Sequence, residues 1–234
     1  MIHILEPHGD DALISCFPFL AGDYVVNGQY IKIVTLGSSR SSRDLMNHFP
    51  LIRDVVYADL YEVPYHIGRA SYSREFKKWK NNGHAGSPWE WQLEVTERHN
   101  GELWMESARI LSSFLIDYLS DLPSGDEVLS PIGIIHPYHI LVASLMREYY
   151  RSGRDDLKYS YYSDAPYNGS SWTREIESSH PQASQKTLVE IPSCRSVEGM
   201  DKEEIFRSVY PSEVKLFRFT YESTIHNTYR FYLS

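Results

Sequence analysis

The chain has 234 residues, of which 42% are hydrophobic and 23% charged, and its formal net charge at pH 7 is −8. This composition is that of a soluble globular protein, and the negative charge argues against general attraction to nucleic acid or to an anionic membrane. No apolar run approaches the roughly 20 residues of a membrane-spanning helix. Cys16 and Cys194 are too few for a disulfide framework, and no signal-peptide pattern is present, so we expect a cytoplasmic protein.

Strands and helices are predicted to alternate over the first 150 residues. The predicted elements are strands at 2–5, 30–36, 59–66 and 126–135 and helices at 11–21, 43–58, 102–121 and 138–150. The first helix should bend or end near Pro18. This alternation is typical of an α/β domain with a mostly parallel sheet and flanking helices, in which ligands bind at the carboxyl ends of the strands.

Two regions depart from the alternation. Residues 67–100 are polar and rich in Trp, Lys, Asn and Gly, and we interpret them as a long loop excursion. Residues 153–234 mix Tyr-rich, strand-like segments with a short helix near 201–209. Because no linker divides the chain, we expect a single domain over 1–234, with its core in 1–150 and a less certain extension over 151–234.

Five polar residues follow two of the predicted strands. His8, Asp10 and Asp11 come after the first strand, and His136 and His139 come after the strand at 126–135, where the next helix begins. The ends of parallel strands share one edge of a sheet, so the two segments can meet at one point. That point would hold three histidines and two aspartates, which is enough for a metal centre.

These residue types suit hydrolysis at a metal. Two histidines and one carboxylate are a common catalytic zinc set, with the fourth position left to water, whose pKa zinc lowers to about 7. A second carboxylate can act as general base, and a remaining histidine can stabilise an oxyanion or protonate a leaving group. The structural alternative is that His8 and Asp11 only stitch and cap the start of the helix.

The two segments resemble the signature of the PIG-L/LmbE-like family of zinc-dependent N-acetylglucosamine deacetylases. The family carries P-H-P-D-D-E after an N-terminal strand and a later H-x-x-H, usually H-P-D-H. Here these motifs read PHGDDA at 7–12 and HPYH at 136–139. The resemblance extends over about residues 1–150, with a loose match of YPSE at 210–213 to the family's YxSQ.

The resemblance implies a Rossmann-like fold and a role for each of the five residues. His8, Asp11 and His139 would bind one zinc ion, or another divalent metal, per chain. Asp10 would be the general base, and His136 would stabilise the oxyanion or donate a proton to the departing amine. The substrate would be an amino-sugar conjugate, since family members remove an acetyl group from an amino sugar attached to inositol, a lipid-linked inositol or malate. The oligomeric state is not predicted.

The chain departs from the family motifs at Gly9, Ala12 and Tyr138. Gly9 replaces a proline and should mainly loosen the turn, and Ala12 replaces a glutamate that is not among the ligands. Tyr138 replaces the aspartate of H-P-D-H. Because losing an outer-shell carboxylate can cost about 10–100-fold in activity or metal affinity, Tyr138 predicts an altered substrate or reduced activity.

Other residues could contact a substrate or only support the fold. Arg40 and Arg43 follow the second strand and could clamp an anionic group, or be solvated loop residues. Three tryptophans of the excursion could form a sugar platform or anchor the segment to the body: Trp79, Trp89 and Trp91. His180 and His226 are expected at the surface.

Two rival functions are compatible with parts of this pattern. His8, Asp10 and His139 could form the two-histidine, one-carboxylate triad of a non-haem iron oxygenase. In such enzymes several barrel strands precede the first histidine, whereas here seven residues do, and the triad leaves Asp11 and His136 without a role. The other rival is a sugar-binding or regulatory module on the same fold, its centre weakened by Tyr138.

Overall fold

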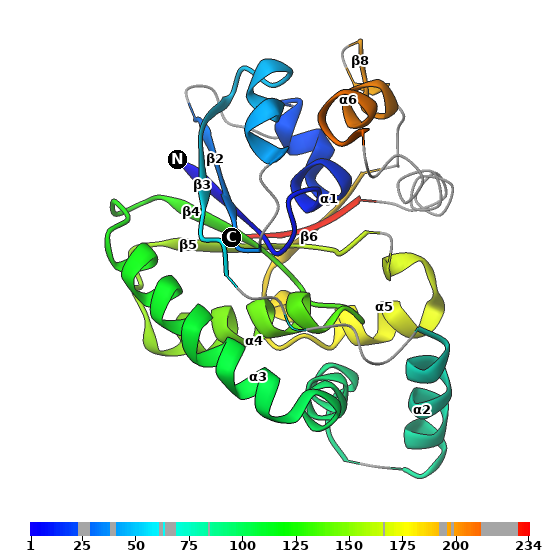
Figure 1. Ribbon diagram of the computed structural model, residues 1–234. Coiled ribbons are helices and arrows are strands. Elements are labelled where there is room, and N and C mark those ends of the chain that lie inside the picture. Colours follow the sequence, from blue (N-terminus) through cyan, green and yellow to red (C-terminus); the bar gives the residue numbers. More distant parts are fainter. Residues whose placement is uncertain are drawn as a thin grey trace.

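The chain forms an α/β fold around a seven-stranded sheet, seen in the computed structural model in Figure 1. The structure describes residues 1–22, 29–37, 41–60, 63, 69–83, 85–165, 167–191, 196–197, 199–211 and 229–234. The strands of the sheet are β1 (Ile2–Glu6), β2 (Ile31–Thr35), β3 (Ile52–Tyr57), β4 (Glu127–Pro131), β5 (Lys158–Tyr162), β6 (Thr187–Ile191) and β9 (Tyr229–Leu233). Their order is β3-β2-β1-β4-β5-β9-β6; the first five pair in parallel, and β9 is antiparallel to both neighbours.

Helices cover both faces of the sheet. They are α1 (Asp11–Leu20), α2 (Arg69–Asn81), α3 (Pro88–Ser120), α4 (Pro137–Ser152), α5 (Ser171–Ser178) and α6 (Lys202–Val209), with 3₁₀ turns η1 (Ser41–Asn47), η2 (Tyr167–Gly169) and η3 (Ala183–Gln185). Figure 1 shows α1 and α6 on one side of the sheet and α3, α4 and α5 on the other. The short strands β7 (Ser196–Val197) and β8 (Met200–Asp201) pair separately. The predicted Rossmann-like α/β architecture with a mostly parallel sheet is confirmed.

The strand order creates a switch point between β1 and β4. From β1 the chain winds outward through β2 and β3, and it then returns to the other side of β1 to form β4 and β5. In open α/β sheets the crevice at such a switch point is where ligands bind, because the connections leave in opposite directions. The residues that directly follow β1 and β4 therefore line this crevice.

The predicted bend of the first helix is confirmed. Cys16, two residues before Pro18, has non-helical backbone angles (φ −119°, ψ 17°), since proline cannot continue the hydrogen-bond ladder. Cys16 is fully buried, as expected of a small apolar side chain. Cys194 lies outside the described residues.

The predicted helix at 43–58 and strand at 59–66 are wrong. The segment forms η1 and then β3, so the third strand comes earlier than expected, and 61–62 and 64–66 lie outside the described residues. The apolar side chains at helix-like spacing are buried together in one cluster: Leu45, Phe49, Ile52 and Val55. Pro50 and the β-branched residues after it favour the strand over the helix.

The polar segment at 67–100 contains helices instead of a loop. After α2, Ser87 begins α3 with a capping box, in which its hydroxyl accepts from the Glu90 N–H at 3.2 Å and Pro88 occupies the first turn. The predicted helix at 102–121 is the second part of α3, beyond Gly101, whose φ of +51° interrupts the helical backbone. The polar composition concealed these helices, because only one stripe of each is buried.

The Tyr-rich C-terminal part extends the same sheet. Strands β5, β9 and β6 continue it past β4, and they bury Tyr161, Tyr162 and Tyr232. The predicted short helix near 201–209 is α6, whereas α5 was not predicted. Among the described residues, none of the helices combines the length and the apolar character needed to cross a membrane.

His180 is buried, which contradicts the surface position expected for it. Its ring meets the Trp89 ring edge-on, with centroids 4.7 Å apart, and it lies 5.0 Å from the Tyr161 ring. Burial and the nearby charge of Arg147 lower the pKa of His180 to about 3, so the imidazole is neutral at pH 7. His226 lies outside the described residues.

Replacing His180 should make stability less sensitive to acid. The pKa of His180 is about 3 in the fold against 6.5 for the free side chain, so its contribution to stability is present above pH 6.5 and is lost as the pH falls toward 3. The unfolding free energy of wild-type protein should therefore fall by about 2 kcal/mol more than that of His180→Gln between pH 7 and pH 5. Denaturant titrations with chelator present check this; equal losses in both proteins would contradict the buried, neutral state.

Candidate metal centre

The ends of β1 and β4 carry the histidines of the site. His8 lies in the turn between β1 and α1, and His136 and His139 lie at the start of α4, with Pro137 at its first position. Gly133 lets the loop after β4 approach α4 closely. Its φ is +75°, and a Cβ at this position would lie 2.7 Å from the Ala143 Cβ. Only glycine is compatible with both conditions.

A glutamine from α3 fixes the same loop. The side-chain amide of Gln92 donates to the Gly133 carbonyl, and its oxygen accepts from the Ile135 N–H, both at 2.8 Å. Ile135 has a φ of +65°, which is unfavourable for a β-branched residue and requires such support. Gln92 is fully buried. It therefore positions His136 without touching the site, and the sequence pattern gave no indication of it.

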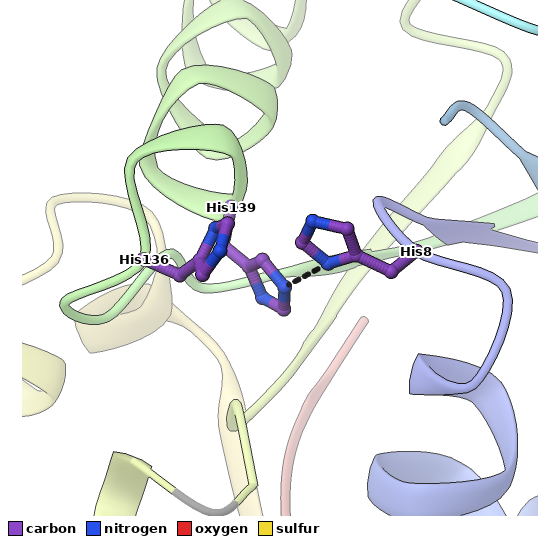
Figure 2. A group of neighbouring side chains, drawn as sticks. All are labelled: His8, His136 and His139. Carbon is purple, nitrogen blue, oxygen red and sulfur yellow. Dashed lines mark hydrogen bonds between the residues drawn. The ribbon is translucent and has the colours of Figure 1, made fainter. Parts of the chain in front are cut away.

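Three side chains form a compact triangle at this crevice. His8 Nδ1 lies 3.0 Å from His139 Nε2, and Asp11 Oδ2 lies 3.3 Å from each of these two nitrogens. The same Asp11 oxygen accepts the backbone N–H of His8 at 2.7 Å, which holds the carboxylate in place. Figure 2 shows His8 and His139 facing each other, with His136 beside them.

The triangle has the dimensions of a metal site. In tetrahedral zinc, bonds of about 2.0–2.2 Å place neighbouring ligand atoms about 3.3–3.6 Å apart. The three observed separations need only a slight expansion to meet this. His136 completes a group of three histidines that could hold a metal ion, with ligand atoms all within 4.8 Å of one another.

Asp164 orients the ring of His139. Its Oδ1 lies 2.6 Å from His139 Nδ1, and its Oδ2 accepts the Ile134 N–H at 3.0 Å. Both Asp164 and His139 are almost completely buried. A carboxylate on the distal nitrogen of a metal-binding histidine fixes the tautomer and leaves the other nitrogen for the ion. Nε2 of His139 is thus the atom presented to the triangle.

The charges of the site suit a cation. Burial lowers the pKa of His139, but Asp11 and Asp164 outweigh burial and raise it to about 9. Burial alone would raise the pKa of Asp11. The contacts with His139 and His8 have the larger, opposite effect, so the pKa is lowered and this carboxylate is ionised. Burial and the two neighbouring imidazoles hold the pKa of His136 well below its usual value. A metal ion would thus replace the proton of His139 between two carboxylates.

Sequence reasoning missed Asp164, although a signal for it existed. Asp164 follows β5 by two residues, so it lies at the same edge of the sheet as the residues after β1 and β4. Tyr138, which stands where the family motif has an aspartate, is fully buried among apolar side chains. The structure therefore provides a carboxylate for His139 from β5, and the substitution at position 138 does not remove it.

Glu6 supports the turn that carries His8 and was also missed. It is fully buried and accepts the Ala12 N–H at 3.0 Å as well as the Ser42 hydroxyl. The Gly9 carbonyl accepts from the Tyr210 hydroxyl and also lies 2.8 Å from the Ser42 hydroxyl, so both side chains fix the turn. Burial raises the pKa of Glu6 to about 8, against the lowering effect of its hydrogen bonds. Tyr210 begins the YPSE segment; 212–213 lie outside the described residues.

The remaining candidates occupy different positions. Asp10 is half-buried at the N-cap of α1, one residue before Asp11. Arg43 is exposed, with its guanidinium 5.7 Å from the centre of the Tyr57 ring, and Arg40 lies outside the described residues. Trp89 is buried, and its indole donates to the Ile132 carbonyl at 3.0 Å, so it anchors α3 to the loop after β4.

Comparison with known proteins does not assign the chain to a family. Neither a protein-family model nor a curated protein sequence matches it.

Asp164 should be needed for tight metal binding. We expect Asp164→Asn to weaken zinc affinity by about 10–100-fold, because His139 loses the charge that fixes its ring. Competition with a chromophoric chelator measures this. Asp126→Asn is a matched control, since Asp126 makes a similar contact with His3 (2.9 Å) outside the candidate site. Equal affinities for wild type and Asp164→Asn would contradict this supporting role of Asp164.

Proposed function

We propose that this protein is a metal-dependent amide hydrolase of the PIG-L/LmbE type, which removes the N-acetyl group from an amino-sugar conjugate. The observation that carries the proposal is the triangle of His8 Nδ1, Asp11 Oδ2 and His139 Nε2, with sides of 3.0 to 3.3 Å. These residues would hold one divalent cation. Two imidazoles and one carboxylate at tetrahedral spacing favour zinc.

The residues around the triangle suit hydrolysis of an amide. A bound divalent cation supplies Lewis acidity and lowers the pKa of a water molecule. Asp10, next to the ligand Asp11, is the general base that takes the proton from this water. Water adds to the acetyl carbon, and as the C–N bond breaks the proton held by Asp10 passes to the departing nitrogen, so that acetate and a free amine leave.

His136 is suited to stabilising the oxyanion. Its ring lies edge-on to His8, with centroids 4.5 Å apart, and its low pKa keeps it neutral at pH 7. A neutral imidazole carries one N–H, which can donate to the oxygen that gains negative charge in the transition state. The low pKa favours this role for His136 over proton donation to the departing amine.

The two rival functions are less well supported by the same contacts. The carboxylate that lies 3.3 Å from His8 and His139 belongs to Asp11, whereas the iron triad requires Asp10. A weakened binding module was suggested by the loss of the aspartate at position 138, yet Asp164 contacts His139 at 2.6 Å. Both observations favour the hydrolase.

Acetate release tests the proposal directly. Zinc-loaded protein is incubated with a panel of N-acetylglucosamine conjugates, and the free amine is measured. We expect Asp10→Asn to bind zinc normally and to lose about 10²–10⁴-fold in kcat, because the general base is removed. Asp44→Asn, an exposed aspartate in η1, is the matched control and should keep full activity.

His136→Ala should also retain zinc while losing activity. Removing one oxyanion donor costs about 10²–10³-fold in kcat. If zinc affinity fell as steeply as it does for His139→Ala, His136 would be a ligand instead. A zinc-loaded protein that binds the conjugates without releasing acetate would refute the hydrolase and support the binding module.

A further inference from the structure

A pocket lies between α2 and α3, and the metal centre contributes none of its lining residues. Its volume is about 310 Å³, close to the lower limit of about 300 Å³ for small-molecule sites. Figure 1 shows α2 on the outside of the helical layer, away from the sheet. The lining residues used below are Glu75, Lys78, Trp79, Asn82, Glu94 and Arg98.

The aromatic part of the pocket is a rigid cluster. Trp79 stacks on Phe76 with centroids 5.7 Å apart and an interplanar angle of 21°, and it lies 5.9 Å from Trp91. The Tyr72 hydroxyl bonds to Thr96, which joins α2 to α3 within the hydrophobic core. Trp91 and Phe76 are buried, whereas Trp79 is half-buried and also lines the pocket. The cluster thus supports a large aromatic ring that solvent can reach.

The polar part of the pocket has no net charge. Glu75 and Glu94 are balanced by Lys78 and Arg98, and Arg98 lies 3.6 Å from Glu75. A strongly charged ligand would meet a like charge on one wall or another. Carboxylates and the Asn82 amide instead offer acceptors and donors for hydroxyl groups.

We propose that this pocket binds a neutral saccharide, which stacks on the indole of Trp79 and bonds through its hydroxyls to Asn82 and Glu94. A pyranose ring with equatorial substituents presents a flat C–H face, which suits an aromatic surface, and a rim of hydroxyls, which suits the polar wall. The pocket is independent of the metal centre, so the proposal does not depend on deacetylase activity.

Binding is tested on the full chain after metal removal, with the neutral saccharides N,N′,N″-triacetylchitotriose and cellotriose as probes. The indole N–H signals of the five tryptophans are followed by NMR. We expect the Trp79 signal to shift with saccharide concentration. The Trp89 signal should stay fixed, because that indole is buried and bonded to the Ile132 carbonyl. No shift with either probe would overturn the proposal.

Variants assign the binding to this pocket. Trp79→Ala should weaken association about tenfold, and Trp79→Phe, which keeps a ring, should weaken it less. Trp172→Phe is the matched control: Trp172 belongs to the same aromatic cluster, with its ring 5.9 Å from Phe76, but it does not line the pocket. If the remaining indole signals of Trp79→Ala reported association as tight as in wild type, the saccharide would bind elsewhere.

Surface variants keep the test valid if Trp79→Ala does not fold. Asn82→Ala combined with Glu94→Gln removes the hydroxyl partners from exposed positions and should leave the fold intact. We expect weaker binding in this double variant, and binding equal to wild type would refute the pocket. Because zinc is absent throughout, failure here would leave the proposed hydrolase untouched, and inactivity of the zinc-loaded protein would leave this site untouched.

Discussion

The parallel pairing of β1 with β4 is the constraint on which the candidate site depends. Ile2, His3 and Ile4 pair with Glu127, Val128 and Leu129, so the two strands run side by side in one direction. The residues that follow them must then meet at one edge, even though His8 and His139 are 131 residues apart in the chain. Because β1 and β4 flank the switch point, the connections that leave them diverge and a crevice forms at that edge. The strand topology thus determines where the candidate site lies, and the side chains determine what it can bind.

The buried charges at this edge stabilise one another. Asp11 and Asp164 contact opposite nitrogens of His139, and the proton that His139 retains, with a pKa of about 9, offsets part of their negative charge. Unpaired carboxylates in such a place would cost several kcal/mol each. The carboxylates therefore keep a charged partner when no ion is bound, and an ion that replaced the proton would find His8, Asp11 and His139 already close together. The arrangement favours a preformed site over one that is assembled by the ion.

The ends of β1 and β4 were predictable from the sequence, because a polar cluster soon after an apolar run is a local pattern. Elements at 43–58 and 69–100 were not predicted correctly, since helix-like spacing also fits the 3₁₀ turn and strand there, and the polar helices bury only one stripe. Asp164 required the end of β5 to be known, which the Tyr-rich segment did not reveal. Gln92 of α3 hydrogen-bonds to the loop after β4, about 40 residues further along the chain, and this contact exists only in the tertiary structure.

Departures from a sequence motif need not weaken a site if another element supplies the same group. Tyr138 stands in place of an aspartate, yet a carboxylate reaches His139 from the end of β5. The histidine ring needs a carboxylate at one point in space, whatever the sequence position that provides it. The altered residue at position 138 is therefore poor ground for inferring a lost metal centre.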